Sequence, residues 1–501
     1  MTRKNEKKQI YKRIMNLITL TAIAAFAISP LVAQTYSIEE GSSTDLYEQK
    51  QSEEIEFTVG GTHYFFTYHF KSPQRHFYLQ STPVGGGAIQ AGELKIDVGV
   101  FNSSNEIEEV VGLGDHAYAL VTNLDKDAGK ASMVALKIDP NGTVAEGGTE
   151  VMQYAFEKIM RSGYFAVATS PDHKMMAVVA TLPFDKKSEA KLKISVYDDQ
   201  LNEVSTGEYT IPGEDMRNKR IEVQMANDGT VYFTRFTNTI KEGYGLLVHQ
   251  YNSKSKSVEN TFDIKMDDDY KMLEYNYGVS PKNELVITGT FYEVKTLTTG
   301  LDPKADHIFF YTNKNKTENL FEKSEISTPA ENLMVTEILF SGETTFVTTE
   351  QIKEERIDNP SNPASTEYNY RYNHGNEYIF GFNEEGKKAF ELILEQSFSM
   401  SNFHRQYASA HHIINGNLIV LYNDAFSKYQ NSGDSAGSSV IPVAVQIDPS
   451  GLMKPAVTFK NDLKLSSGHT MYTCYSLTEG NSIVTMIRHL NTMKIATIKV
   501  N

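Results

Sequence analysis

The stretch "VSPKNELVITGT", residues 279–290, has the form of a β-hairpin. An apolar residue precedes a tight polar turn, and a run of strand-forming residues follows the turn. Pro, Asn, Asp and Gly suit such turns because they preset φ or tolerate a positive φ. The same form returns at "MANDGTVYFTRF" and "IINGNLIVLYND", which indicates a repeated structural unit.

Eight turns of this kind divide the chain, centred near residues 60, 114, 172, 228, 282, 342, 416 and 480. A second hairpin, such as "LKISVYDDQLNEVSTGEYTI", follows most of the first ones, so each unit reads as four short antiparallel strands. Continuous apolar runs such as "MAVVA" predict strands buried on both faces. Alternating runs such as "KLKISVY" and "VAVQI" predict strands with one face in water.

The predicted fold is an all-β propeller of four-stranded antiparallel blades. Seven or eight blades fit the turns, and eight is favoured, although the first unit is the least regular and is alternatively a capping element. The last unit lacks a fourth strand, which "TYSIEEGSSTDLYEQK" near the N-terminus can supply. Pairing of the N- and C-terminal strands would close the ring and remove open sheet edges. A pair of β-sandwiches is the alternative fold.

The N-terminus predicts export. A basic segment, "MTRKNEKKQIYKR", precedes an apolar stretch that ends in small residues, which is typical of a signal peptide spanning residues 1–33. Residues 34–501 are then a single propeller domain in the periplasm or at the cell surface. An uncleaved membrane anchor is the alternative, although Asn16, Ser29 and Pro30 disfavour a membrane span. After cleavage no integral membrane span is expected.

Charge and cysteine content restrict the partners. The formal net charge is −15, and without residues 1–33 the remaining 42 basic and 62 acidic residues give −20. Such a chain repels phosphate backbones, so nucleic acid is not an expected partner. The single cysteine, Cys474, excludes an internal disulfide framework and is interpreted as a buried apolar residue. We expect a monomer with no cofactor and no metal.

The segment "EERIDNPSNPASTEYNYRYNHGNEY", residues 354–378, accounts for the longest gap between turns. Long insertions often carry function, and Tyr and Arg give a large contact area with polar tips. The segment therefore supplies the candidate ligand-binding residues, which are Tyr368, Tyr370, Arg371, Tyr372 and His374. The alternative is a long hairpin whose tyrosines pack on the neighbouring blade.

Other motifs are interpreted as structural. Residues 433–437, "GDSAG", match G-x-S-x-G, but no strand leads into the motif and no helix follows it, so a flexible loop is predicted. His411 and His412 are adjacent on a predicted strand and should point to opposite faces, one into the core and one into solvent. Acidic loops at 125–129 and 267–269 are read as solvated loops, with weak calcium binding as the alternative.

A longer stretch carries a family resemblance. The segments "FVTTEQ", "NEYIFGFNEEGKKAFELILEQSF" and "YASAHHIINGNLIVLYND", within Phe346–Asp424, resemble exported β-propeller-like proteins of Bacteroidetes-type Gram-negative bacteria. In that group a strand ending in Glu-Gln precedes a Tyr-rich insertion, a Phe-x-x-x-Gly-Lys hairpin and an apolar strand ending in Asn-Asp. This chain departs from the group in lacking a Trp in the hairpin. The resemblance implies export and a propeller-like fold, and it implies no activity.

Two functions remain open from the sequence. The first is a binding or scaffold module for a protein, peptide or glycan at the cell envelope. The second is a hydrolase or lyase acting on glycans or peptides, with carboxylates near the propeller axis. No acid–base pair is identifiable from spacing, so the non-enzymatic reading is favoured, and the fold alone does not decide between them.

Overall fold

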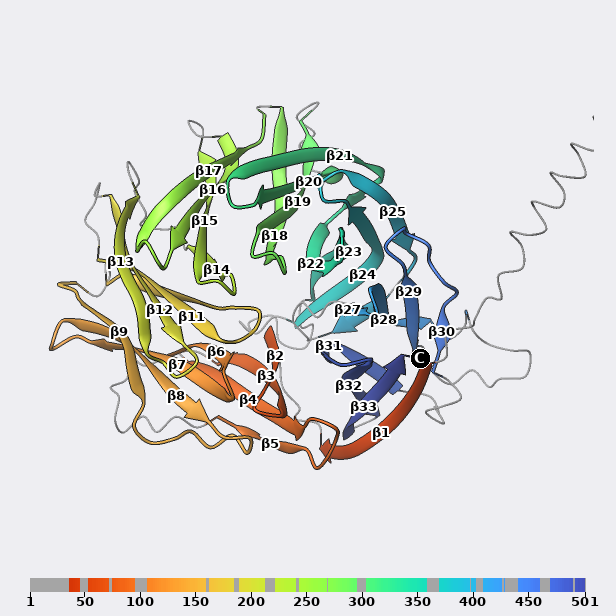
Figure 1. The fold of residues 1–501 in the computed structure, drawn as a ribbon. Coiled ribbons are helices and arrows are strands. Elements are labelled where there is room, and N and C mark those ends of the chain that lie inside the picture. The colour runs from red at the N-terminus through yellow and green to blue at the C-terminus, as the bar shows by residue number, and fades with distance from the viewer. Residues whose placement is uncertain are drawn as a thin grey trace, which may run out of the picture.

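A computed structural model of the chain forms a ring of eight antiparallel blades around a central axis (Figure 1). The sequence favours this eight-bladed propeller, and the fold prediction is confirmed. The structure describes residues 36–45, 53–71, 74–94, 106–158, 162–183, 189–211, 221–239, 243–267, 269–294, 303–357, 369–396, 398–401, 409–425, 428, 440–459, 469–489 and 492–500.

The first four blades follow one another along the chain, each with its strands in sequence order. They are β2 (Glu53–Val59), β3 (Thr62–Lys71), β4 (Gln74–Pro83) and β5 (Gln90–Glu93); β6 (Glu106–Leu113), β7 (His116–Asp125), β8 (Lys130–Ile138) and β9 (Thr149–Ala155); β10 (Tyr164–Thr169), β11 (Met175–Thr181), β12 (Ala190–Asp198) and β13 (Glu203–Ile211); and β14 (Glu222–Met225), β15 (Thr230–Thr239), β16 (Gly243–Asn252) and β17 (Ser257–Lys265).

The second four blades keep this order, except that the last one takes its outer strand from the N-terminus. They are β18 (Tyr270–Val279), β19 (Leu285–Glu293), β20 (Lys304–Lys314) and β21 (Glu318–Glu331); β22 (Leu333–Ser341), β23 (Thr344–Ile357), β24 (Asn369–Phe382) and β25 (Lys388–Leu394), with β26 (Phe398–Ser401) paired to β24; β27 (Ser409–Ile414), β28 (Asn417–Ala425), β29 (Val440–Ile447) and β30 (Val457–Thr458); and β31 (His469–Glu479), β32 (Ser482–His489), β33 (Thr492–Val500) and β1 (Tyr36–Asp45).

The first strand of each blade lies at the centre of the ring. Consecutive first strands contact each other all the way round, from β2 through β31 and back to β2. At the outside of the last blade, β1 pairs antiparallel with β33, from Tyr36 opposite Val500 to Asp45 opposite Thr492. Strands from the two ends of the chain therefore share one blade, and this blade joins the ring to its beginning.

The apolar cores lie between blades. Eight separate clusters of buried residues each combine side chains from two neighbouring blades, and the one that joins the last blade to the first contains Phe65, Val484 and Met486. A chain of this length therefore needs no single large core. One sequence prediction is wrong here: Ile441–Ile447 in β29, the "VAVQI" strand, is buried at every position because both faces pack on neighbouring blades.

The repeated turns contact one another around the ring, which gives the repeated sequence a physical reason. All eight lie between the first and second strands of their blades. The Gly114 amide donates to the carbonyl of His173 in the next turn, and the Asp172 amide donates to Asn227 in the turn after that. Similarly, the Ser341 hydroxyl donates to the Gly416 carbonyl. Each turn thus helps to hold its neighbour.

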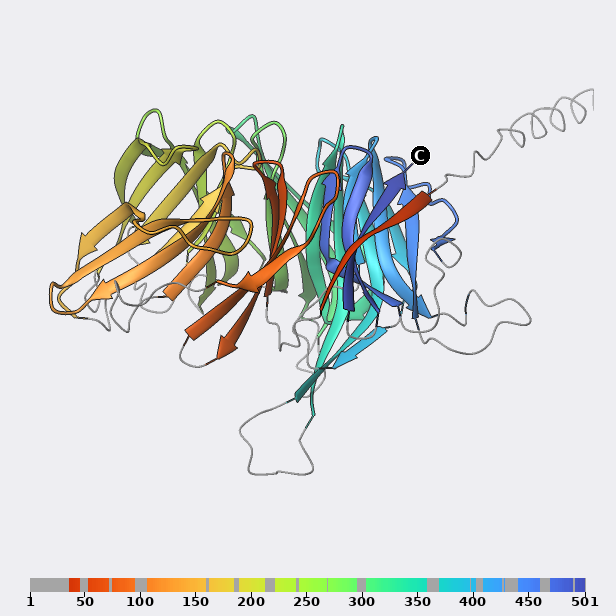
Figure 2. The ribbon, with the colours of Figure 1, turned by 90° about the horizontal axis from the view of Figure 1, so that it is seen from below.

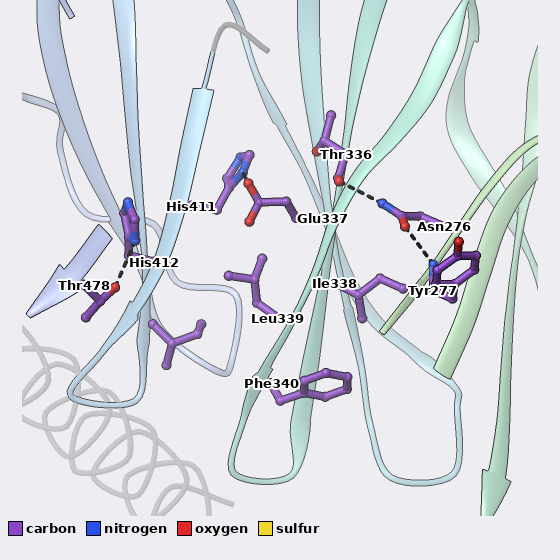
Figure 3. A pocket seen from close by; sticks show the side chains of 11 residues that line it. Asn276, Tyr277, Thr336, Glu337, Ile338, Leu339, Phe340, His411, His412 and Thr478 are labelled. Carbon is purple, nitrogen blue, oxygen red and sulfur yellow. Dashed lines mark hydrogen bonds and ion pairs between the residues drawn. The ribbon is translucent and has the colours of Figure 1, made fainter. Parts of the chain in front are cut away.

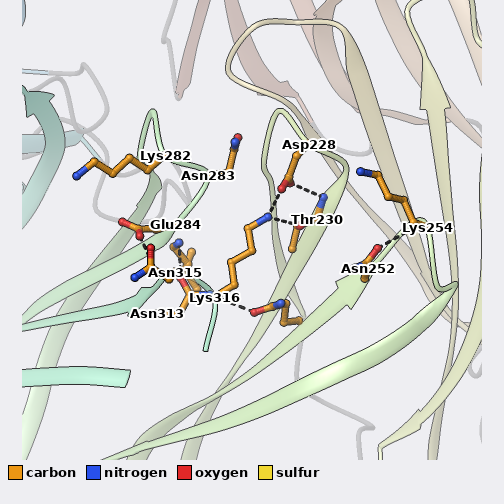
Figure 4. Close-up of polar contacts among 12 residues, drawn as sticks. Asp228, Thr230, Asn252, Lys254, Lys282, Asn283, Glu284, Asn313, Asn315 and Lys316 are labelled. Atoms are coloured by element: carbon orange, nitrogen blue, oxygen red, sulfur yellow. Dashed lines mark hydrogen bonds and ion pairs between the residues drawn. The ribbon is translucent and has the colours of Figure 1, made fainter. Parts of the chain in front are cut away.

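Polar side chains strengthen these junctions between the fourth and fifth blades (Figure 4). Lys316, in the turn between β20 and β21, reaches across to Asp228 in the turn before β15 and to the hydroxyl of Thr230, the first residue of β15. Behind it, the buried amide of Asn313 donates to Tyr232 at 3.2 Å and accepts from the Leu285 amide at 2.7 Å. The turns at the ends of these hairpins therefore connect the strands of one blade and also hold neighbouring blades together.

Gly60 and its neighbour Gly61 test this packing of turns. Both have positive φ, +55° and +72°, but a Cβ on Gly60 would stand 2.3 Å from the Asp115 carbonyl oxygen of the next blade, whereas one on Gly61 would meet nothing within 4 Å. We expect Gly60→Ala to lower the free energy of unfolding by about 1–3 kcal/mol more than Gly61→Ala. Equal losses in denaturant unfolding would show that the turns do not pack so closely.

Candidate functional site

A pocket of about 500 Å³ opens on the inner wall of the ring (Figure 3). Its lining comes from β18, β22, β27 and β31, which are the first strands of four consecutive blades. The lining residues are Asn276, Tyr277, Thr336, Glu337, Ile338, Leu339, Phe340, His411, His412, Ile413 and Thr478. Concave sites with a few convergent polar groups are the usual places where proteins bind ligands.

A β-bulge in β22 adjoins the carboxylate of the pocket. The register shifts between Val335, opposite Thr349, and Glu337, opposite Thr348. A bulge places two consecutive residues on the same face of the sheet. Consistent with this, the Thr336 hydroxyl contacts Thr348 at 2.6 Å while Glu337 contacts the following blade. The bulge therefore brings Thr336 to the face of Glu337, which points toward β27 (Figure 3).

His411 is held between two carboxylates. Its Nε2 lies 2.5 Å from Oε1 of Glu377 on β24, and its Nδ1 lies 3.2 Å from Oε1 of Glu337. Glu377 also accepts hydrogen bonds from the Ser409 hydroxyl at 2.6 Å and from the Gln396 amide at 3.2 Å. Its side chain is 1% exposed, whereas that of Glu337 is 39% exposed. Glu377 is thus a buried anchor, and Glu337 faces the pocket.

The two carboxylates make His411 a cation. Burial alone would lower the pKa of His411, but the charges of Glu377 and Glu337 and the hydrogen bonds to them outweigh burial and raise the pKa to about 10. One positive charge shared between two negative charges leaves a net charge of −1. Because the shorter contact is to Glu377, the charge that remains uncompensated lies mainly on Glu337.

His412 lies on the opposite face of β27, toward the last blade. Its Nδ1 lies 3.0 Å from the Thr478 hydroxyl and its Nε2 lies 2.9 Å from the Ser476 hydroxyl, both on β31. The sequence correctly predicts opposite faces for the two histidines, but the prediction that one faces solvent is wrong. Both are buried, at 5% and 7% exposed, because each face of a first strand packs on a neighbouring blade.

The neutral state of His412 predicts acid sensitivity. Burial, the largest cause, and the nearby His411 cation lower the pKa of His412 to about 4, against an opposing effect of Glu337. The unfolded chain then binds the proton more readily, so stability is complete above pH 6.5 and falls as the pH drops toward 4. Relative to His412→Gln, the free energy of unfolding of the natural protein should fall by about 3 kcal/mol over this range.

Chemical denaturation of both proteins at several pH values measures this difference. His249, whose pKa burial and Arg235 also lower to about 4, is present in both proteins, so its contribution cancels in the comparison. A stability difference that stays constant between neutral and acidic pH would contradict a neutral, buried His412.

The predicted ligand-binding segment forms a hairpin. Strand β23 continues to Ile357, and strand β24 begins at Asn369. The two paired strands project beyond the other blades (Figure 2). The long hairpin is the arrangement that the sequence leaves open as an alternative to a loop. Leu333, the first residue of β22, pairs with Gln351, and the hairpin continues beyond Gln351. The hairpin therefore projects from the side of the ring on which β22 and the other first strands begin.

The structure describes the side chains of three of the five predicted binding residues, and these three differ in exposure. Arg371 is exposed, whereas Tyr372 is 4% exposed and His374 is 3% exposed, with its Nδ1 lying 2.8 Å from Oε1 of the buried Glu350. Tyr370 lies on β24, where its side chain is outside the described part, and Tyr368 lies outside the described residues. Ligand binding by this segment stays a prediction.

The sequence did not identify Glu337 and Glu377 as site residues. The two glutamates are 40 positions apart in the sequence. The one local signal that points to the site is the adjacent pair His411 and His412, but their spacing does not reveal which residues they contact. The G-x-S-x-G motif at 433–437 lies outside the described residues, as do residues 1–35 with the predicted signal peptide.

Two further observations concern metals and membranes. In the described part of the chain, no group of three or more His, Cys, Asp or Glu side chains is placed to hold a metal ion. In the acidic loop at 125–129, the Asp125 carboxylate accepts the amides of Asp127 and Ala128, at 3.0 and 2.9 Å. Among the residues with described structure, no helix is both long and apolar enough to cross a membrane.

Comparisons with known proteins give a general likeness only. No family model and no curated protein matches the sequence. Among solved structures, polysaccharide lyase Uly1 is similar with a TM-score of 0.40 and 12% identity, over 83% of this chain and 99% of the lyase. Prolyl oligopeptidase B from Galerina marginata has a TM-score of 0.37 and 10% identity over 90% of this chain, which spans 55% of the length of that enzyme.

The propeller domain of the Trilobed protease from Pyrococcus furiosus is also similar, with a TM-score of 0.34 and 9% identity, over 90% of this chain and 95% of that domain. Identities and TM-scores this low carry no argument about activity.

Proposed function

We propose that this chain is an exported, non-enzymatic binding propeller that takes its ligand in the axial pocket. The observation that carries the proposal is the pocket of about 500 Å³ on four adjacent first strands, with a single partly exposed carboxylate, Glu337, among its lining residues. A protein segment, a peptide or a glycan at the cell envelope is the class of ligand that a site on this exposed ring wall would accommodate.

The state of the polar groups favours binding over catalysis. Hydrolysis of a glycosidic bond normally uses two carboxyl groups that both reach the substrate. Here Glu377 lies behind His411 and is 1% exposed, so Glu337 is the one carboxylate among the lining residues that can contact a ligand in this pocket. Both histidines that line the pocket use their two ring nitrogens in contacts with protein groups. The hydrolase or lyase with carboxylates near the axis is therefore the second candidate.

A thermal-shift screen of residues 35–501 against glycans, peptides and divalent cations tests the proposal. A ligand at about 100 times its Kd adds about 2.7 kcal/mol to the free energy of unfolding. We expect at least one peptide or glycan to raise the Tm. Product analysis of the same mixtures should show no cleavage. Turnover of a hit that stops in Glu337→Gln would instead support the hydrolase or lyase.

The proposed location has its own test. If residues 1–33 are a signal peptide, protein recovered from the cell envelope or the medium should begin near residue 34. N-terminal sequencing of the full-length product, expressed in a Gram-negative host, gives this directly. An intact N-terminus retained in the membrane fraction would support an uncleaved anchor, and recovery from the cytoplasm would contradict export.

A further inference from the structure

We infer that the axial pocket selects a cation carried on an alkyl chain, such as the ammonium group of a lysine side chain. This inference rests on the proposed binding function and names the chemical class of its ligand. It starts from the cavity and from the charge that Glu337 presents to it, and three features of the lining lead to the same class.

The first feature is the balance of hydrogen-bond donors and acceptors. The Asn276 amide donates to the Thr336 carbonyl at 2.9 Å, and its oxygen accepts the Tyr277 amide at 2.8 Å. His411 is committed to its two carboxylates. Glu337 makes one contact to His411 and is 39% exposed, so its carboxylate retains the capacity to accept further hydrogen bonds. The pocket thus presents a hydrogen-bond acceptor, the Glu337 carboxylate, and a ligand with a hydrogen-bond donor would complement it.

The second feature is charge. The unit formed by Glu337, His411 and Glu377 carries a net charge of −1, located mainly at the pocket surface. The first strands of the blades add to this field, because their described side chains include eight glutamates and one lysine, Lys271. The glutamates are Glu56, Glu106, Glu108, Glu109, Glu222, Glu274, Glu337 and Glu479. An anionic ligand would be repelled, and a cation would be attracted toward the axis.

The third feature is the apolar wall beside the carboxylate. Leu339, two residues after Glu337 on β22, lies on the same face of the strand as Glu337, and Ile338 and Phe340 lie on the other face (Figure 3). All three side chains are partly buried and line the pocket. An alkyl stem can lie along such a surface while its charged end reaches a polar group. A lysine side chain combines these properties. A neutral sugar would need protein donors, and the Asn276 amide and the two histidine rings of the lining are already engaged.

Calorimetric titration of residues 35–501 with a matched pair of capped tripeptides, Ala-Lys-Ala and Ala-norleucine-Ala, tests the inference. Norleucine keeps the alkyl stem and lacks the ammonium group. We expect the lysine peptide to bind at least about tenfold more tightly, since a hydrogen bond to a charged group contributes this much. Glu337→Gln should abolish the preference. Glu343→Gln, which removes an exposed charge from the turn after β22, should leave it intact.

A second variant at position 337 and a small amine separate the effects of charge, of protein stability and of the peptide backbone on binding. Glu337→Asp keeps the charge and should keep the preference even if its stability changes. Butylamine that binds as tightly as the lysine peptide would support the ammonium class and identify a small amine as sufficient. Equal binding of the two peptides, or a preference that survives in Glu337→Gln, would overturn the inference. So would a screening hit that is a neutral glycan in this pocket, and that result would leave the binding function standing.

Discussion

Replacing Glu377 with glutamine is expected to lower the free energy of unfolding by about 3–5 kcal/mol, as removal of one partner from a buried ion pair does. Glu377 lies 2.5 Å from His411 and also accepts hydrogen bonds from Ser409 and Gln396. Glutamine keeps the shape of the side chain, so little of the loss comes from a cavity. The loss comes from leaving the His411 cation with a single, more exposed carboxylate.

Urea unfolding of the natural protein, Glu377→Gln and Glu337→Gln measures this effect. Glu337 contacts the same histidine at a longer distance and is more exposed, so its removal should cost about 0–1 kcal/mol, as for surface ion pairs. A loss below about 1 kcal/mol for Glu377→Gln would show that His411 is not a buried cation.

The pH dependence gives a second view of this ion pair. The folded-state pKa of His411, about 10, lies above its ordinary value of 6.5. The stabilisation is therefore complete below pH 6.5 and is lost as the pH rises toward 10. The difference in unfolding free energy between the natural protein and Glu377→Gln should shrink over this range. A difference that grows on the alkaline side would contradict the assigned charge.

Removing the N-terminal strand is expected to lower the stability of the ring strongly and to promote association. A chain that begins at residue 46 lacks β1, so the edge of β33 is exposed and the last blade keeps three strands. Tyr36, 8% exposed, also packs edge-to-face on Phe459 of the preceding blade, at 6.0 Å between ring centroids. Loss of one buried aromatic side chain alone costs about 3–5 kcal/mol, and the exposed edge promotes association.

Thermal unfolding and size-exclusion chromatography of residues 35–501 and 46–501 test this prediction. The truncated chain should unfold at a lower temperature and form aggregates. A synthetic peptide of residues 36–45 should restore part of the stability, and a scrambled peptide of the same composition should not. An unchanged Tm after truncation would show that pairing of the chain ends does not stabilise the ring.

The fold was predictable because its signals are local. Turn residues such as Gly60 and Asn283 need a positive φ, and the structure gives φ values of +55° and +63° at these two positions. The strand-forming runs around them then specify hairpins without reference to distant residues. The prediction of a wet face in β29 was wrong because burial depends on how closely the neighbouring blades pack. In β12 the prediction is partly confirmed, since Lys191 is exposed and Lys193 is partly exposed.

The site was not predictable because its residues meet through tertiary packing. A bulge in β22 brings Thr336 to the face on which Glu337 and Leu339 point toward β27, and the sequence carries no clear signal for that bulge. Glu377 lies on a third strand and reaches His411 only when two blades pack together. Tyr372 and His374, which the sequence analysis names as candidate ligand-binding residues, lie buried on β24. The hairpin remains the competing location for a ligand.

Hydrogen exchange of residues 35–501, with and without a saturating concentration of the lysine tripeptide, shows where the ligand binds. It separates the axial pocket from the projecting hairpin, since the two are on different peptide segments. The proposal predicts slower exchange at 276–277, 336–340 and 411–413, with residues 369–374 unchanged. Protection confined to 369–374, with the pocket strands unaffected, would contradict it.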